Sequence, residues 1–116
     1  MERDRGMRIE TKKNGAVSIL KIHERKLDAA ISPELKGEFL VVCKPQLKEP
    51  VIDLSEVEFC DSSGLSALLI AERKMRERGG VVKLVGVHKK VLSLIKISHL
   101  DRAFPVFDTV AKAIKG

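Results

Sequence analysis

The chain has 116 residues and a formal net charge of +6. This length predicts a single domain over residues 1–116, large enough for a hydrophobic core without disulfides or metal. Hydrophobic residues make up 44% and charged residues 33%, which excludes a disordered or collagen-like chain, and the longest apolar runs are too short to cross a bilayer.

The charged first residues are not followed by the apolar segment of a secretory signal, so we expect a cytoplasmic protein. Cys43 and Cys60 lie in apolar stretches and are expected to be buried thiols without disulfide or metal. The chain has four Phe and no Trp or Tyr, which argues against a surface that stacks nucleobases.

The positive charge is unevenly distributed. Residues 1–26 carry eight basic and four acidic groups, residues 27–60 carry three and seven, and residues 61–116 carry eleven and five. These counts give +4, −4 and +6, a pattern that favours patchy contact with proteins over a continuous nucleic-acid stripe. The basic residues at 73–78 fall in the last turns of a predicted helix, where the helix dipole favours cations, so they do not require a nucleic-acid partner.

The first half of the chain predicts a hairpin and then a helix. Residues 7–12 and 16–22 are strand-like, with Asn14-Gly15 as the turn between them. Ser32-Pro33-Glu34 predicts a helix start with Ser32 as the cap, and the apolar residues Leu35, Phe39, Val42 and Cys43 should face the core.

The second half alternates strands and helices. Strands are expected at 51–54, 81–87 and 104–107, with a short extended approach at 57–60 that leads into the next helix. One helix is expected to begin after Asp61 and to end at Gly79-Gly80. A second is expected over 89–98, and a third after Asp108, which would be its cap. The order is β-β-α-β-α-β-α-β-α. It predicts an α/β fold with a mixed sheet of about five strands, helices packed on it, and a functional edge at the strand-to-helix turns.

The turn Asp61-Ser62-Ser63-Gly64 has more capping residues than one helix start requires. Plain capping explains it; alternatively, a hydroxyl is left free at a helix N-terminus, where Gly64 allows close approach by another molecule. A serine hydrolase is disfavoured, because the nucleophile elbow and a nominated base are missing. The phosphate-binding loop and the response-regulator acidic pair are also missing, so we expect no enzyme activity and no cofactor.

Residues 51–55 and 57–69 closely resemble the core motif of bacterial anti-sigma factor antagonists, which are single STAS domains. Leu27-Asp28-Ala29-Ala30, Gly79-Gly80 and 98–101 extend the resemblance over most of the chain. The resemblance implies a STAS fold and a partner switch. The unmodified protein would bind an anti-sigma factor that is also a serine kinase and so release a sigma factor.

By the same resemblance, the kinase would phosphorylate Ser62, the serine directly after the motif's Asp61, and a phosphatase would reverse this. The partner-binding residues implied are Asp28, Ala29, Asp61, Ser62, Ser63, Gly64 and Ser66. The chain departs from the family at Arg25 and His99, where relatives often have Gly, and the Arg25 change concerns the choice of partner. We expect a monomer or weak dimer.

Two other functions fit the sequence. A STAS module can serve as a protein-interaction subunit of a transport or stress-signalling assembly, and the sequence hardly separates this from the first function. A small basic nucleic-acid-binding domain is the other, and the salt dependence of a DNA shift would identify it.

Overall fold

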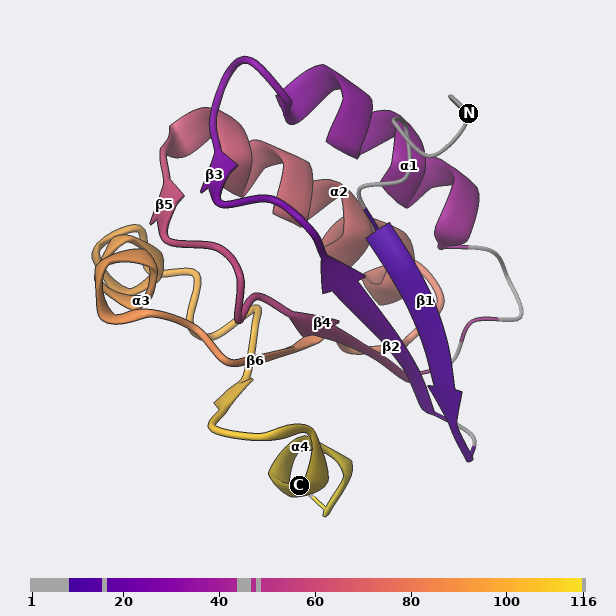
Figure 1. The fold of residues 1–116 in the computed structure, drawn as a ribbon. Coiled ribbons are helices and arrows are strands. Elements are labelled where there is room, and N and C mark those ends of the chain that lie inside the picture. Colours follow the sequence, from indigo (N-terminus) through magenta and orange to yellow (C-terminus); the bar gives the residue numbers. More distant parts are fainter. Residues whose placement is uncertain (1–8, 16, 44–46, 48, 116) are drawn as a thin grey trace.

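The computed structural model describes residues 9–15, 17–43, 47 and 49–115. A five-stranded sheet has the order β1-β2-β4-β6-β7 (Figure 1). Its first two strands form an antiparallel hairpin, and every later strand pairs in parallel with its neighbour. The strands are β1 (Ile9–Asn14), β2 (Val17–Ile22), β4 (Glu49–Asp53), β6 (Lys83–Val85) and β7 (Val106–Phe107). This is the mixed sheet that the sequence predicts.

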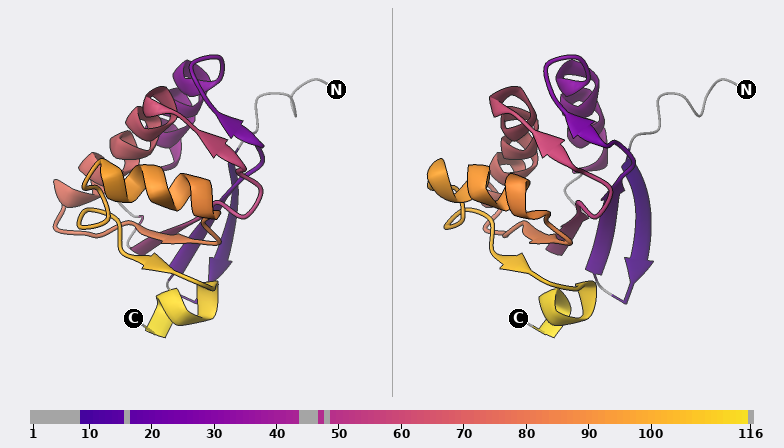
Figure 2. Two further views of the ribbon diagram at one scale, coloured as in Figure 1. Left: turned by 90° about the vertical axis from the view of Figure 1, so that its left-hand side faces the viewer. Right: turned by 60° about the vertical axis from the view of Figure 1, so that its left-hand side comes forward.

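In the described part of the chain, four helices lie on the two faces of this sheet, as Figures 1 and 2 show. One face packs against the first three helices and holds the main core, and the last helix covers part of the other face. The helices are α1 (Ser32–Val42), α2 (Ser62–Arg76), α3 (Lys89–Ile97) and α4 (Val110–Lys115). The alternation of side chains along a strand explains the two cores. In β2, Leu20 and Ile22 enter the main core, whereas Val17 packs in the smaller cluster with Ala113 of α4.

A second sheet of two short parallel strands lies outside the main one. It consists of β3 (Lys26–Leu27) and β5 (Phe59–Cys60), with Leu27 opposite Cys60. The first of these strands was not predicted, because two residues are too few to show a period. The pair positions the candidate site, since each strand leads directly into one of the two turns that the sequence singles out.

Two local predictions are corrected by the structure. Asn14 pairs with Val17, so Asn14 belongs to β1 and not to the turn; Gly15, which follows it, has the positive φ of 66° that a tight turn needs. Residues 7, 8 and 16 of the predicted strands lie outside the described residues. The strand predicted over 81–87 is limited to Lys83–Val85, because only these residues find a partner on β4.

Two predicted helix caps also differ. Residue 31 occupies the cap position of α1, and Ser32 is the first helical residue, with its hydroxyl turned to another helix. At α4 the hydroxyl of Thr109 accepts a hydrogen bond from the Lys112 N–H at 3.2 Å, so Thr109 caps this helix. Asp108 instead forms an ion pair with the Lys112 ammonium at 3.3 Å.

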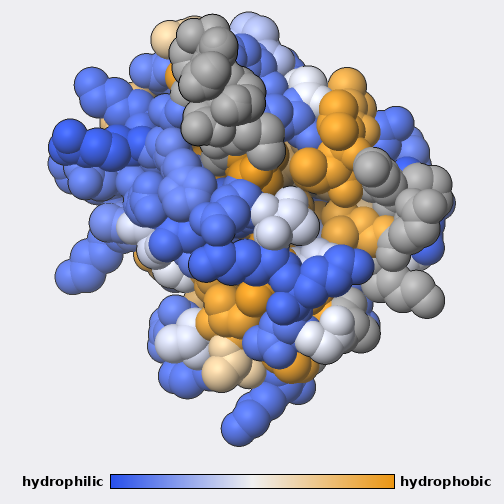
Figure 3. Space-filling view, turned by 45° about the vertical axis from the view of Figure 1, so that its right-hand side comes forward, coloured by the Kyte–Doolittle hydropathy of each residue, from blue (hydrophilic) through white to orange (hydrophobic). Residues whose placement is uncertain are grey.

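Hydrophobic side chains also reach the surface. Leu40 and Val41 of α1 are exposed, and Figure 3 shows hydrophobic side chains over α1 and again toward α4, with hydrophilic side chains between them. Among the described residues, no helix is both long enough and apolar enough to cross a membrane.

Candidate partner-binding site

The two chemically rich turns lie side by side because β3 and β5 pair. The Asp61 N–H donates a hydrogen bond to the Leu27 carbonyl at 3.1 Å, which continues the pairing by one residue. Asp28 follows β3 directly, and Asp61 follows β5 directly. The two carboxylates are 33 residues apart in sequence but belong to neighbouring turns, one between β3 and α1 and the other between β5 and α2.

Gly64 allows α2 to approach β3 closely. A Cβ atom at this position would lie 2.2 Å from the Leu27 carbonyl oxygen and 2.6 Å from the Leu27 Cβ. Gly64 is buried, so the close approach that the sequence predicts is made by the chain's own strand and not by another molecule. This glycine positions the site without presenting a surface to a partner.

Asp61 alone provides the cap of α2. Its carboxylate accepts a hydrogen bond from the Gly64 N–H at 3.0 Å. The Ser63 carbonyl accepts a hydrogen bond from the Ser32 hydroxyl at 2.9 Å, which joins the starts of α1 and α2. Within the described part of the chain, the exposed Ser62 hydroxyl makes no hydrogen bond. It is the surplus hydroxyl that the sequence suggested.

The remaining predicted residues surround Ser62. The Asp28 carboxylate accepts a hydrogen bond from the Ala30 N–H at 3.0 Å, which fixes the turn after β3. Asp28 is partly exposed and Ala29 is fully exposed. Ser66 is exposed one helical turn beyond Ser62, so it lies on the same face of α2. Of the seven predicted contact residues, Gly64 is the one that is buried.

A family model described as the STAS domain matches residues 8–113. The chain belongs to the STAS domain family. This confirms the resemblance found in the sequence. Among curated proteins, the anti-sigma-B factor antagonist of Listeria monocytogenes is 32% identical over 79 residues, which are 66% of this chain and 67% of that protein. Other curated relatives, also named as antagonists, are matched over 55% and 59% of their length.

Solved structures share this fold. The crystal structure of an anti-sigma factor antagonist from Mycobacterium paratuberculosis is 26% identical, with a TM-score of 0.80, over 92% of this chain and 90% of that one. A sulfate transporter family protein from Wolinella succinogenes, 22% identical with a TM-score of 0.74, has the same fold over 90% of this chain and 86% of that one. The fold alone therefore does not distinguish these two settings of a STAS domain.

The two departures from the STAS pattern have different structural meanings. Non-glycine residues with positive φ are limited, in the described ranges, to His99, which follows the end of α3 with a φ of 59°. This is a left-handed conformation that Gly adopts without strain. Arg25 is in no such conformation. Its exposed side chain forms an ion pair with Glu58 at 3.1 Å, one residue before β5.

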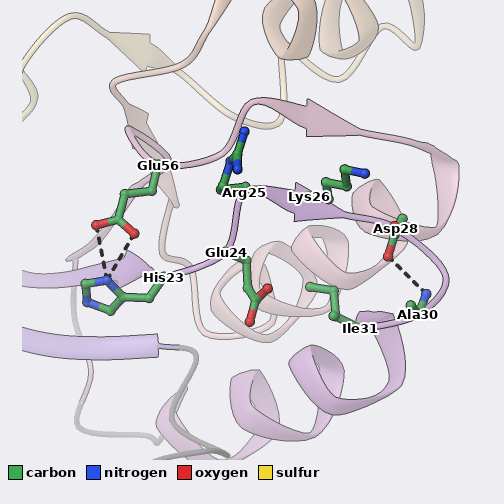
Figure 4. A pocket seen from close by; sticks show the side chains of 8 residues that line it. All are labelled: His23, Glu24, Arg25, Lys26, Asp28, Ala30, Ile31 and Glu56. Carbon is green, nitrogen blue, oxygen red and sulfur yellow. Dashed lines mark hydrogen bonds and ion pairs between the residues drawn. The ribbon is translucent and has the colours of Figure 1, made fainter.

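Sequence reasoning missed a pocket beside this site. It has a volume of about 610 Å³ and reaches from the Asp28 turn to the His23 imidazole, whose contact with Glu56 is drawn in Figure 4. The His23 Nε2 lies 2.7 Å from a Glu10 oxygen, and its Nδ1 lies 3.2 Å from a Glu56 oxygen. The lining residues are His23, Glu24, Arg25, Lys26, Asp28, Ala30, Ile31 and Glu56. No sequence signal could reveal this cluster, because its members are 13 and 33 residues apart.

The two carboxylates favour the charged imidazole. A neutral imidazole has one N–H to donate, whereas a protonated one donates from both nitrogens. The hydrogen bond to Glu10 is the main cause that raises the pKa of His23, and the bond to Glu56 adds to it. The same contact with His23 lowers the pKa of Glu10.

Cys60 is close to the site in sequence but not available to it. Burial, and to a lesser extent the charge of Asp61, raises the pKa of this thiol to about 12. Burial also raises the pKa of Cys43. Both are free thiols, as the sequence predicts, and neither has thiolate character for nucleophilic chemistry. Within the described ranges, no group of three or more His, Cys, Asp or Glu could hold a metal ion.

Proposed function

We propose that this chain is an anti-sigma factor antagonist that is switched by phosphorylation of Ser62. In the unmodified state, it binds an anti-sigma factor with serine kinase activity, and the sigma factor is released. The chain itself is a regulator without catalytic activity. A phosphatase restores the unmodified state.

The observation that carries the proposal is the position of the Ser62 hydroxyl. It is exposed at the N-terminus of a 15-residue helix whose cap is supplied by Asp61, so it is not needed for the fold. Asp61 directly precedes it in the same turn, and Asp28 lies in the neighbouring turn after β3. The names of the curated relatives support the same function.

Phosphorylation at this position leaves the fold intact. A phosphate adds about −1.5 to −2 charges, and a helix N-terminus favours a negative charge by about 0.3–1 kcal/mol. The effect appears at the interface, where a partner would remove water from the phosphate beside two carboxylates. A cost of about 4 kcal/mol would weaken binding roughly a thousandfold.

The test measures binding, phosphorylation and melting of Ser62 variants, using the anti-sigma factor kinase of the organism that encodes this chain. Ser62→Ala should bind like the wild type and resist phosphorylation. Ser62→Asp should bind at least about tenfold more weakly, because a single charge is smaller than a phosphate, and should keep the wild-type Tm.

Ala111→Asp is the matched control. It adds the same charge on an exposed position of α4, on the other side of the sheet, and should not change binding. If Ser62→Ala were phosphorylated as fast as the wild type, Ser62 would not be the acceptor, and Ser63→Ala would be tested next.

A further inference from the structure

An exposed aromatic side chain lies next to the candidate site. Of the four Phe residues, Phe39 and Phe104 are fully buried, and Phe107 is partly buried beneath the Lys83 ammonium, 5.4 Å from its ring. Phe59 in β5 is 47% exposed and comes two residues before Asp61. Aromatic side chains are enriched among the residues that dominate binding energy.

Basic residues lie on both sides of Phe59. Lys26 of β3 is its partner in the strand pairing, so the two side chains point to the same face, and both are exposed. On the other side, α3 packs against β5, and its exposed Lys89 and Lys90 line a hollow of about 460 Å³ together with Glu58. Figure 2 shows α3 beside β5 on the outer side of the molecule.

Little negative charge is available to neutralise these lysines. Residues 79–100 contain no Asp or Glu. Glu58, the one acid that lines the hollow, is already paired with Arg25 at 3.1 Å. In the described structure, Lys26, Lys89 and Lys90 form no ion pair with an acidic side chain. We call the set Lys26, Phe59, Lys89 and Lys90 the Phe59 surface.

We propose that the anti-sigma factor covers the Phe59 surface as well as the Ser62 turn, and that it presents there an apolar recess for Phe59 flanked by carboxylates. This inference rests on the proposed function and adds the chemistry of the partner. The two surfaces are adjacent, because only the buried Cys60 and the partly exposed Asp61 separate the exposed Phe59 from the exposed Ser62. The partner would meet acidic groups at Asp28 and Asp61, and basic groups around Phe59.

This charge pattern favours a protein over nucleic acid. A phosphate backbone would be attracted by the lysines but repelled by the two aspartates at the other end of the same surface. A protein surface can place opposite charges at each end, which sets the orientation of the complex and speeds association.

The experiment compares two charge-reversing double variants and one truncation. Lys89→Glu with Lys90→Glu should slow association with the anti-sigma factor at least tenfold at low salt and make the association rate less dependent on salt. Lys13→Glu with Lys115→Glu is the matched control, since it reverses the same charge on exposed lysines of the hairpin and of α4. Phe59→Ala should weaken binding about 10- to 100-fold while the Tm stays within a few degrees.

Each outcome decides between the two proposals. If the wild type binds the anti-sigma factor and the Lys89/Lys90 and Phe59 variants bind equally well, the Phe59 surface is not part of the interface, and the proposed function stands. If the wild type binds no anti-sigma factor, both proposals fail. If the wild type instead shifts a 30-base-pair DNA duplex and the Lys89/Lys90 variant does not, the surface is a nucleic-acid site, which overturns this inference.

Discussion

At the scale of single residues, the sequence identifies the hydroxyl but not the imidazole beside it. Asp61, Ser62 and Ser63 are consecutive, and their excess of capping groups is visible in the printed sequence. His23 is notable only because it contacts two carboxylates, that of Glu10 on β1 and that of Glu56 on the segment after β4. Such a cluster depends on how strands are brought together, and a single sequence carries no pattern for it.

The raised pKa of His23 predicts how stability changes with pH. The pKa of His23 lies higher in the folded chain than its ordinary value of 6.5. The contacts of His23 with Glu10 and Glu56 therefore stabilise the fold fully below about pH 6.5, and this stabilisation is lost as the pH rises through the folded-state pKa. The cluster is half exposed, so the effect is small. Near pH 5.5 the wild type should melt about 1–4 °C above His23→Gln, and near pH 9 the difference should vanish. An equal difference at both pH values would show that the imidazole acts through packing and not through charge.

At the scale of elements, the long periodic helices were predictable, whereas the two-residue strand β3 was not. α2 was predicted from its cap and from the helical spacing of Leu65, Leu68, Leu69 and Met75; Leu69 is partly buried and the other three are buried. β3 and β5 have two residues each, and tertiary pairing alone defines them. The packing of α2 on β3 could not be predicted from a local sequence pattern either, since Gly64 by itself indicates only a glycine at the start of a helix.

This docking predicts opposite effects for two glycine substitutions. Gly64→Ala forces a Cβ onto the Leu27 carbonyl, so it should lower the free energy of unfolding by about 3 kcal/mol. Gly37→Ala, in the exposed middle of α1, meets nothing within 4 Å and should raise that free energy by about 0.5–1 kcal/mol. Urea unfolding of both variants measures this. A neutral Gly64→Ala would mean that α2 can move away from β3 at little cost.

At the scale of the whole molecule, the order along the chain of the main-sheet strands and of the helices followed from the sequence. The structure adds that the core is divided by the sheet, with a large part under α1, α2 and α3 and a small part under α4. The lengths of the strands could not be predicted, because a strand extends only as far as a neighbouring strand pairs with it. In β6, three residues are paired where a strand of seven was predicted.

The main core predicts how the thiols respond to alkylation. Cys43 is 2% exposed and Cys60 is 8% exposed, and both belong to the same core cluster. Iodoacetamide near pH 8 should therefore label them only when the core opens, at least about a thousandfold more slowly than in 6 M guanidinium. Mass spectrometry over time measures both sites. Fast labelling of Cys43 alone would show that the end of α1 opens separately from the rest of the core.

The contact between Gly64 and Leu27 has a consequence for how a partner recognises this protein. Because a strand and a helix start are locked together there, the Asp28 turn and the Ser62 turn cannot move independently. Under the proposed function, a kinase or an anti-sigma factor would meet a preassembled shape and would lose little conformational entropy in ordering it. The affinity of that complex would then depend on the chemistry of the surface, so that adding or removing one phosphate would be enough to switch it.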